Sequence, residues 1–357
     1  MKKILITGSG GPAGVNFLKS LTLGNSEIES YGTDINIYHL EFAKPWTEKT
    51  FLVPRATSDQ FLPTINNIIR EYHIDMVHPQ PDIEVSILSE YREKIDAITF
   101  LPKKDTIRCC QNKYLSANIW KERMFPSVKA IEIRYDHLES DLESAINSFG
   151  EKLWIRAKKG AGGTGSTLIE NEETGVNWIK YWKSRGKDWE FIAQEYLPGR
   201  NIAFQSIFKN GELICSQARE RLEYIYPYLA PSGVTGTPIV AKTIHDDIVN
   251  NMASEAILAI DSDATGIFCV DMKEDKTGSI CPTEINAGRF FTTSYFFSYA
   301  GKKYNVPLAN MPNILVKLAF DEKIPAGPKY NILPKNLYWI RHIDCSEHLI
   351  EEKDLHL

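Results

Sequence analysis

Charged and amide side chains interrupt an otherwise apolar part of the chain at TEINAGR, residues 283–289. The preceding ATGIFCVDM (residues 264–272) and the following FFTTSYFF (residues 290–297) are rich in residues that favour strands. Burying an unpaired charge costs several kcal/mol. A chain with this pattern must therefore fold so that other groups partner the polar side chains of this segment.

Strand geometry predicts that three polar groups converge here. Glu284 and Asn286 are two residues apart, so they share one face of a strand. A two-residue turn at Thr277–Gly278 would place Asp271 directly opposite Glu284. Opposed carboxylates repel each other unless a cation separates them, and oxygen ligands beside a phosphate suit Mg²⁺. The alternative is the solvated face of an ordinary hairpin.

Composition and charge are those of a folded protein without a bias toward nucleic acid or membranes. A length of 357 residues favours two or three domains, and 43% of the residues are hydrophobic. A formal net charge of −5 gives no basis for a general nucleic-acid or membrane-surface role. No apolar run approaches the ~20 residues that span a bilayer.

The N-terminus and the cysteines indicate a reducing compartment. Glycines interrupt MKKILITGSGG before the apolar run of a signal peptide could develop. The six cysteines contain no CxxC pair, which argues against a zinc site or a thioredoxin-type motif. We therefore expect a cytoplasmic protein with free thiols.

The first hundred residues alternate strand and helix patterns. Apolar runs at 2–7, 28–35 and 75–80 predict strands, and runs with helical spacing at 15–21 and 62–74 predict helices. A βαβαβ order of this kind favours a parallel, doubly wound sheet.

The loop GSGGPAG after the first predicted strand fits a nucleotide-binding fingerprint through Gly8, Gly11 and Gly14. Asp34 lies about 20 residues beyond this loop, at the position of a ribose-binding acid. One interpretation is a nicotinamide-dependent oxidoreductase, and the other is a tight turn that packs a helix on a strand. The Tyr-x-x-x-Lys pattern of short-chain dehydrogenases occurs only at Tyr299–Lys303, which argues against the oxidoreductase.

Antiparallel signals dominate from about residue 106 onward. Residues 152–157 and 167–170 predict two strands joined by a glycine-rich loop, 158–166. Residues 200–221 predict a strand pair around Asn210–Gly211, a strong hairpin turn. This half of the chain is therefore expected to be α+β.

Three motifs in this half have a functional and a structural interpretation. The glycines of 160–165 can lie over phosphates or form a flexible hairpin. The strand end Gln194–Leu197 can pair with an adenine edge or simply leave the core. Arg219, Arg221 and Glu223 alternate on one strand face, where they could bind an anion or protect an exposed edge strand.

The segment HPQPDIEV, residues 78–85, follows a predicted parallel strand. Gln80, Asp82 and Glu84 would then lie in the crevice at the carboxyl end of the sheet. The alternative is a helix start that Asp82 caps.

Taken together and in this order, the motifs resemble the ATP-grasp superfamily, in the branch near the large subunit of carbamoyl-phosphate synthase. NKYLSANIWKE (112–122) resembles the segment that supplies a first phosphate-binding lysine, and WIRAKKGAGGTGS (154–166) resembles the strand and glycine flap over the triphosphate. QEYLPG (194–199) resembles the adenine hinge, and ARERLE (218–223) resembles the Arg-x-Arg strand near the transferred phosphoryl group. VDM with TEINAGR resembles the metal strand pair.

The resemblance implies a role for each group of residues. ATP would be bound by Lys113, Arg156, Gly162, Gly163, Thr164, Gly165, Gln194, Glu195, Tyr196 and Leu197. The metal ligands would be Asp271, Glu284 and Asn286, and the catalytic cations Arg289, Arg219 and Arg221. The second substrate would lie against Gly10, Gly11, Gln80, Asp82 and Glu84. Asn201 departs from the pattern, because many members carry a ribose-binding acid shortly after the hinge glycine.

The resemblance also implies the architecture, an α/β and α+β chain in which a Rossmann-like pre-ATP-grasp domain precedes a two-lobed ATP-grasp fold. The expected domains are 1–105 and 106–320, with a small lobe at about 124–193, and a C-terminal extension at 321–357.

The implied activity is that of an ATP-dependent carboxylate–amine ligase. An acyl phosphate would form with release of ADP, and an amine would then displace phosphate to give an amide. ATP and Mg²⁺ are the expected cofactors, and the partners are a small-molecule carboxylate and an amine, with no nucleic acid and no membrane. Phosphoryl transfer of the carbamoyl-phosphate type, the oxidoreductase and a homodimeric state remain open alternatives.

Overall fold

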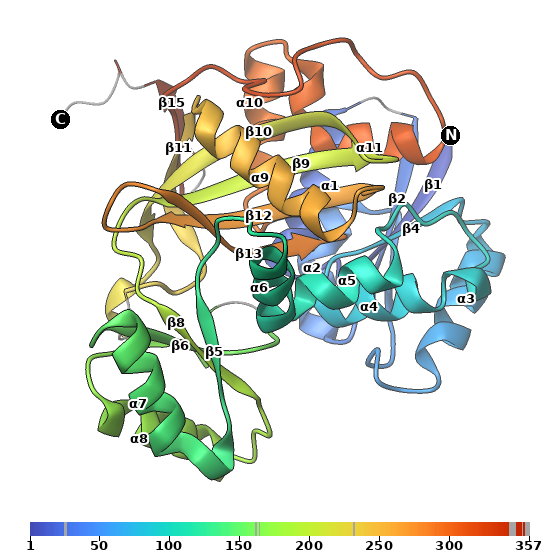
Figure 1. Cartoon of the computed structure of the whole chain (residues 1–357). Helices are drawn as coiled ribbons and strands as arrows, with labels where there is room; N and C mark the ends of the chain where they lie inside the picture. Colours follow the sequence, from blue (N-terminus) through green and yellow to red (C-terminus); the bar gives the residue numbers. More distant parts are fainter. Residues whose placement is uncertain are drawn as a thin grey trace.

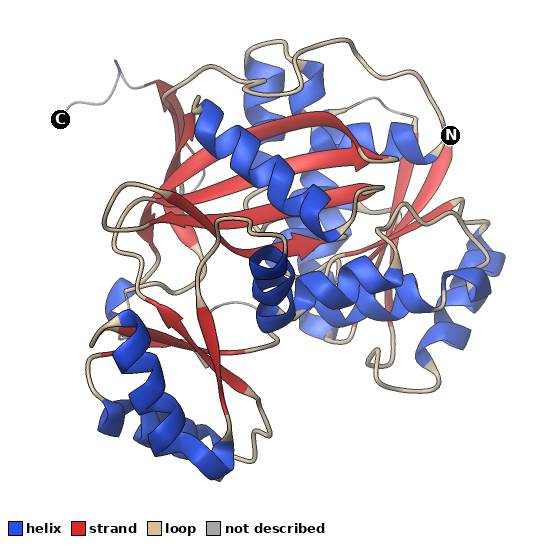
Figure 2. Cartoon of the chain, viewed as in Figure 1, coloured by secondary structure: helices blue, strands red, loops and turns tan. Residues whose placement is uncertain are grey.

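The computed structural model of the chain describes residues 1–24, 27–160, 163, 165–230, 233–342, 348–351 and 353. These residues form three β-sheets with helices packed against them (Figure 1, Figure 2). In Figure 1 the large sheet occupies the upper part, the N-terminal sheet lies to its right, and a small sheet with two helices lies below to the left.

The N-terminal sheet is parallel, with the strand order β3-β2-β1-β4. Its strands are β1 (Lys2–Thr7), β2 (Ile28–Asp34), β3 (Lys49–Leu52) and β4 (Met76–Pro79). Its helices are α1 (Pro12–Leu23), α2 (Ile37–Ala43), α3 (Phe61–Tyr72) and α4 (Asp82–Glu90), with short 3₁₀ turns at Lys44–Trp46 and Arg92–Lys94. The predictions of β1, β2, β4, α1 and α3 are confirmed, whereas the sequence did not predict α2 and β3.

The loop between β1 and α1 is a tight turn. Gly8 has a positive φ of 61°, and a Cβ on Gly14 would lie 2.4 Å from the Gly8 carbonyl oxygen. Pro12 is the first residue of α1, where its missing N–H leaves no hydrogen bond unmade. The glycines thus let α1 begin directly against the end of β1.

The small sheet is antiparallel, with the order β5-β8-β6-β7. Its strands are β5 (Ala130–Ile133), β6 (Leu153–Ala157), β7 (Thr167–Ile169) and β8 (Phe191–Glu195). The helices α7 (Leu138–Phe149) and α8 (Glu172–Ser184) cover one face, and a 3₁₀ turn at Tyr135–His137 precedes α7. Leu142, Leu153 and Ile155 belong to a separate apolar core, so this lobe packs on itself.

The large sheet has the order β13-β12-β9-β10-β11-β14-β15. Its strands are β9 (Asn201–Lys209), β10 (Glu212–Tyr224), β11 (Pro238–Ile244), β12 (Gly266–Glu274), β13 (Ile280–Ala287), β14 (Leu337–Ile340) and β15 (His348–Glu351). The predicted β9–β10 hairpin is confirmed, because Asn210 and Gly211 have φ values of 51° and 78°, as a two-residue turn with two left-handed residues requires.

Helices cover both faces of the large sheet. On one face lie α5 (Lys104–Gln111), α6 (Lys113–Glu122) and α9 (Asp247–Ile260), as Figure 1 shows. On the other lie α1, α10 (Tyr295–Lys303) and α11 (Met311–Ala319), and 3₁₀ turns occur at Pro227–Leu229 and Pro307–Ala309. None of the helices in the described ranges could cross a membrane, given its length and hydropathy.

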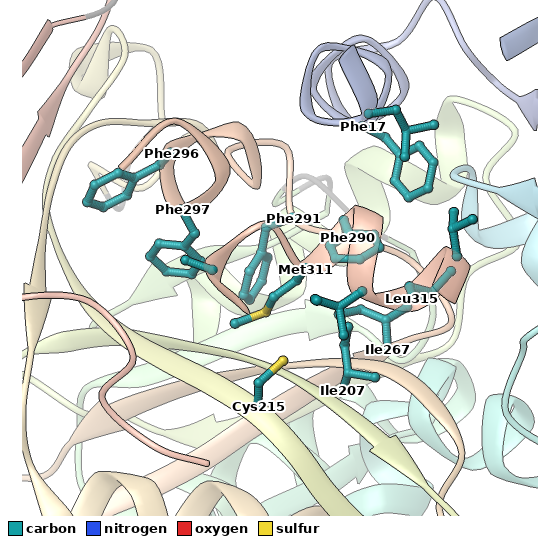
Figure 3. Packing of buried hydrophobic residues seen from close by; sticks show 14 of the residues in the cluster. Phe17, Ile207, Cys215, Ile267, Phe290, Phe291, Phe296, Phe297, Met311 and Leu315 are labelled. Carbon is teal, nitrogen blue, oxygen red and sulfur yellow. The ribbon is translucent and has the colours of Figure 1, made fainter. Parts of the chain in front are cut away.

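One apolar core joins the N-terminal and C-terminal parts of the chain. Phe17 of α1 packs in the same cluster as Ile267 of β12 and Leu315 of α11 (Figure 3). Phe290, which follows β13, belongs to the same cluster. Trp339 of β14 belongs to it as well, stacked on Phe296 with ring centroids 5.4 Å apart. The segment after residue 320 therefore continues the large sheet and its core, while the predicted domain boundaries stay predictions.

Replacing Trp339 by alanine tests this shared core. The indole is only 2% exposed, so Trp339→Ala should lower the free energy of unfolding by about 3–5 kcal/mol through lost burial and a cavity. Ile248→Ala on the outer face of α9 is the control, with an expected change within about 0.5 kcal/mol. Chemical denaturation of both variants measures the difference, and equal effects would remove β14 from the core.

Candidate active site

A cavity of about 560 Å³ lies where the three sheets meet. Its lining comes from the loop before α1, the start of α4, strands β6, β8, β10, β12 and β13, and the segment after β13. Residues from all but one of the predicted motifs line it, the exception being 112–122: Gly11, Gln80, Asp82, Arg156, Gly163, Gln194, Glu195, Tyr196, Leu197, Arg219, Arg221, Asp271, Glu284, Asn286 and Arg289. Predicted residues from Gly11 to Arg289 are thus gathered around one space. Gly10, Glu84, Lys113 and Gly165 do not line it.

The predicted register of the polar strand pair is confirmed, because Asp271 lies opposite Glu284. The predicted turn is wrong. Asp275 closes a longer loop, in which its carboxylate accepts from the N–H groups of Thr277 and Ser279 at 2.7 and 2.9 Å. An irregularity in β13 between Asp271 and Met272 leaves Thr283 as an extra residue, which compensates for the longer loop.

Two cations from other elements hold Glu284. Its Oε2 accepts from Arg156 Nη2 of β6 at 2.7 Å and lies 3.2 Å from Lys113 Nζ at the start of α6. Burial would raise the pKa of Glu284, but the charges of Arg156 and Lys113 outweigh it and hold this pKa well below its usual range. Burial in turn lowers the pKa of Lys113. Glu284 is therefore a carboxylate fixed between two phosphate-binding candidates.

Asp271 is neutralised separately. Its Oδ1 lies 2.5 Å from Arg221 Nη2, and its Oδ2 accepts from Asn286 Nδ2 at 3.2 Å. Burial and the charge of Glu284 raise the pKa of Asp271, while Arg221 opposes this shift. The two opposed carboxylates are thus kept in place by protein cations on either side.

Arg289 extends the network to the N-terminal sheet. It donates to the amide oxygen of Asn286 and forms an ion pair with Asp82 at the start of α4. A second contact joins Arg289 Nη2 to Asp82 Oδ2 at 3.3 Å. The capping interpretation of Asp82 is wrong, because Pro81 is the N-cap of α4 and no side-chain cap hydrogen bond forms. Asp82 instead positions Arg289 and connects the N-terminal sheet to the cluster of Asp271, Glu284 and Asn286.

Arg219 and Arg221 point inward, but Glu223 does not join them. The pairing of β10 with β11 is irregular between Arg221 and Glu223, and Glu223 is exposed. The predicted common face therefore holds only for the two arginines. Since β10 pairs with β9 and β11, it is not an edge strand, and the edge-protection interpretation is wrong.

The predicted hinge and Gly163 of the predicted flap also line the cavity. Gln194 is buried, and Glu195 accepts from the Lys129 N–H at 2.9 Å. A Cβ on Gly163 would lie 3.6 Å from the Val234 carbonyl, so the flap meets the connection between β10 and β11. Of the other predicted flap residues, Gly165 has a φ of 75° beside Trp189, and Gly162 and Thr164 lie outside the described residues.

The N-terminal loop uses Asp34 internally. Its carboxylate accepts from the N–H groups of Gly10 at 3.2 Å and Asn36 at 3.0 Å. Asp34 is 5% exposed, so it holds the loop closed rather than facing a ribose. This arrangement favours the tight-turn interpretation of the glycine fingerprint over a dinucleotide site.

Several cavity residues were missed by the sequence interpretation. Trp154 shares a strand face with Arg156, and Lys273 lies 5.9 Å from the ring of Tyr196. The period-2 alternation of β6 and β12 would have found both residues. Thr292 and Thr293 also line the cavity. They lie in a segment without strand or helix periodicity, so no sequence pattern pointed to them.

Comparison with known proteins places the fold. No family model and no curated protein matches the chain. The biotin carboxylase domain of 2-oxoglutarate carboxylase from Hydrogenobacter thermophilus, a complex with MgADP, ADP and bicarbonate, has a TM-score of 0.70 at 14% identity, covering 95% of this chain and 73% of that one. N5-carboxyaminoimidazole synthetase from Staphylococcus aureus, complexed with ADP, has a TM-score of 0.70 at 16% identity over 95% and 82%.

L-amino acid ligase from Bacillus licheniformis has a TM-score of 0.66 at 12% identity, covering 95% of this chain and 79% of that one. All three are ATP-grasp enzymes. The chain has the ATP-grasp fold. The predicted resemblance is thereby confirmed at the level of the fold.

Glu84 gives the folding stability of the protein a measurable pH dependence. Burial, with a smaller contribution from Asp34, raises its pKa from 4.5 to about 7. The folded state therefore keeps a proton that the unfolded state loses above pH ~4.5, and stability falls as pH rises toward ~7. Glu84→Gln should gain about 3 kcal/mol over wild type at pH 8 and little at pH 4.5. Denaturation at both values checks this, with exposed Glu143→Gln as the control; parallel curves for Glu84→Gln and wild type would contradict it.

Proposed function

We propose that the protein is an ATP-dependent carboxylate–amine ligase that works through an acyl phosphate and releases ADP and phosphate. The observation that carries the proposal is the single cavity in which an adenine-type hinge, a flap, a pair of opposed carboxylates and the N-terminal crevice converge. The ATP-grasp fold supports the same assignment.

The two ends of the cavity suit the two ends of ATP. Trp154 and Leu197 provide apolar contact near the strand end at Gln194, where a base would lie. Lys113 and Arg156 provide fixed positive charge for phosphates, and the glycines of the flap allow close backbone approach. Lys273 stands beside Tyr196 and could reach the ribose or a phosphate in place of the missing acid at Asn201.

The residues present fit Mg²⁺. Asp271 and Glu284 supply carboxylate oxygens and Asn286 an amide oxygen, all of them hard ligands. Among the described residues no group of three or more histidine, cysteine, aspartate or glutamate side chains gathers, so a site made of protein acids alone is not formed. Nucleotide phosphates would complete the ligand set, and two bound Mg²⁺ ions would neutralise phosphate charge.

The arginines then carry the chemistry. The substrate carboxylate oxygen attacks the γ-phosphorus, the bond to the β-phosphate oxygen breaks, and ADP leaves. The amine attacks the acyl carbon, phosphate departs with the C–O bond pair, and the amine loses a proton to the medium. Arg221 and Arg289 are placed to offset charge on the transferred group, which is most of what phosphoryl transfer requires of a protein.

Binding must rearrange the cluster. Glu284 already forms ion pairs with Lys113 and Arg156. Phosphates can therefore bind these two cations only if the Glu284 carboxylate receives another partner. A metal ion brought by the nucleotide would provide it. We therefore expect Mg²⁺ and ATP to bind together rather than one after the other.

The finer architecture and setting belong to the same proposal. The four-stranded parallel sheet would act as a Rossmann-like pre-ATP-grasp domain, with 106–320 as the ATP-grasp domain and 321–357 as its extension. The protein would act in the cytoplasm on a small-molecule carboxylate and an amine, and a homodimer remains compatible with this. Release of a carbamoyl phosphate instead of an amide is the alternative product.

Nucleotide choice is the first test. Mg-ATP should raise the melting temperature, because a ligand that binds only the folded state stabilises it by mass action. NADH and NADPH should have little effect, since Asp34 is committed to Gly10 and Asn36. ADP release across a panel of carboxylates and amines then identifies the substrates. A shift with NADH but none with Mg-ATP would refute the ligase assignment.

Glu284→Gln tests the metal cluster. The amide keeps the size of the side chain but removes one metal ligand charge, so turnover should fall about a thousandfold, or ~4 kcal/mol. The folded protein should also lose about 1–3 kcal/mol of stability, because Lys113 and Arg156 keep only a neutral acceptor. Turnover and melting temperature are compared with wild type and with Glu212→Gln on the surface. Near-normal turnover would remove Glu284 from the metal site.

A further inference from the structure

Arg219 is a buried guanidinium that lacks an anionic partner among the described residues. Its side chain is 1% exposed, yet it lines the cavity. Nη1 donates to the Thr293 carbonyl at 3.2 Å, while Nε and Nη2 have no hydrogen-bond partner. Asp271, the carboxylate whose charge acts on Arg219, is already paired with Arg221.

Such a group is costly unless a ligand completes it. The guanidinium lies 5.1 and 5.4 Å from the ring centroids of Phe291 and Phe297, and Figure 3 shows both rings in the apolar cluster. Cation–π contacts recover only part of the cost of burying this charge. An anion from the cavity is the partner that would satisfy the N–H groups of Nε and Nη2.

The start of α1 and Thr293 complete an anion site beside Arg219. Gly11 offers no side-chain cap to α1, and the first turn contains no acid, so its first N–H groups are free for an anion. The Thr293 hydroxyl is buried without a partner and lines the same part of the cavity. Asn16 of α1 donates to the Thr292 carbonyl at 3.0 Å, which fixes the helix to this segment.

This anion site is distinct from the cluster of Asp271, Glu284 and Asn286. Arg219 and Arg221 are two residues apart on β10, so their backbones are separated by about 7 Å along the strand. Arg221 pairs with Asp271, whereas Arg219 donates to the Thr293 carbonyl, and both guanidinium groups lie 5.1 Å from the ring centroid of Phe291. The cavity therefore holds positive charge at two places, only one of which the transferred phosphoryl group needs.

We propose that the substrate carries a second anionic group besides the reacting one, and that Arg219, Thr293 and the N-terminus of α1 bind it. The inference rests on the proposed ligase function and specifies the substrate class, namely dicarboxylates or carboxylates that bear a phosphate. Arg219 would thus set specificity and would not neutralise the transferred phosphoryl group.

The test measures binding to the full-length protein by calorimetry, with and without a non-hydrolysable Mg-ATP analogue. The probes are dicarboxylates from succinate to pimelate, 3-phosphonopropionate, and butyrate as the singly charged control. Wild type should prefer a doubly charged probe to butyrate by at least tenfold. Arg219→Met should abolish that preference and leave affinity for the nucleotide analogue unchanged within twofold.

A matched variant separates this inference from the ligase proposal. Arg156→Met should weaken the nucleotide analogue and keep the preference for the doubly charged probe. If wild type binds the probe through Arg219 but does not bind the analogue, the anion site stands and the ligase proposal fails. If the preference is absent from wild type or survives in Arg219→Met, the anion site is refuted.

Stability provides an independent reading if Arg219→Met binds nothing. Removal of an unpaired buried charge should leave the melting temperature of the ligand-free protein unchanged or raise it. A lower melting temperature would identify Arg219 as a structural residue and overturn the proposal. Thr293→Val, which removes only the hydroxyl, should weaken the doubly charged probe severalfold while folding normally; unchanged affinity would count against the site.

Discussion

The ion pairs of Glu284 with Arg156 and Lys113 are the interaction on which the arrangement of the molecule depends. The three groups come from β13, β6 and α6, and each would be costly to bury alone. They can be buried only together, which requires the small lobe to lie against the large sheet. The same contact that joins the lobes therefore assembles the cavity between them.

The paired cluster also explains how the cavity can be stable without ligand and still accept one. The network contains four cations, Lys113, Arg156, Arg221 and Arg289, against the carboxylates of Asp82, Asp271 and Glu284. A metal nucleotide offers a like-for-like exchange, because phosphates can replace Glu284 on its cations while the metal ion replaces those cations on Glu284. Each charge keeps a partner before and after binding, so the exchange avoids exposing an unpaired ion to the protein interior.

Local patterns in the sequence predicted the elements that depend on local chemistry. The strands β1, β2 and β4 and the hairpin at Asn210–Gly211 follow from apolar runs and turn residues, and the structure confirms them. The short α2 was not predictable, because Ile37, Tyr38 and Phe42 are exposed and give it no apolar stripe toward the core. The partners of Glu284 were likewise beyond periodicity, since Arg156 lies 128 residues away along the chain. Only the order of motifs, through the resemblance to ATP-grasp enzymes, brought these residues together in advance.

The strand pair that holds Asp271 and Glu284 shows how a correct register can arise from a different local structure. The loop at Asp275 is longer than a two-residue turn, which alone would shift every later residue of β13 by one place. Such a shift turns side chains to the opposite face of a sheet. The extra residue at Thr283 restores the phase just before Glu284, and its hydroxyl donates to the Asp271 carbonyl at 3.0 Å. The irregularity is therefore what directs Glu284 and Asn286 into the cavity, and the polar face of β13 depends on Thr283 as much as on the residues that would bind the metal.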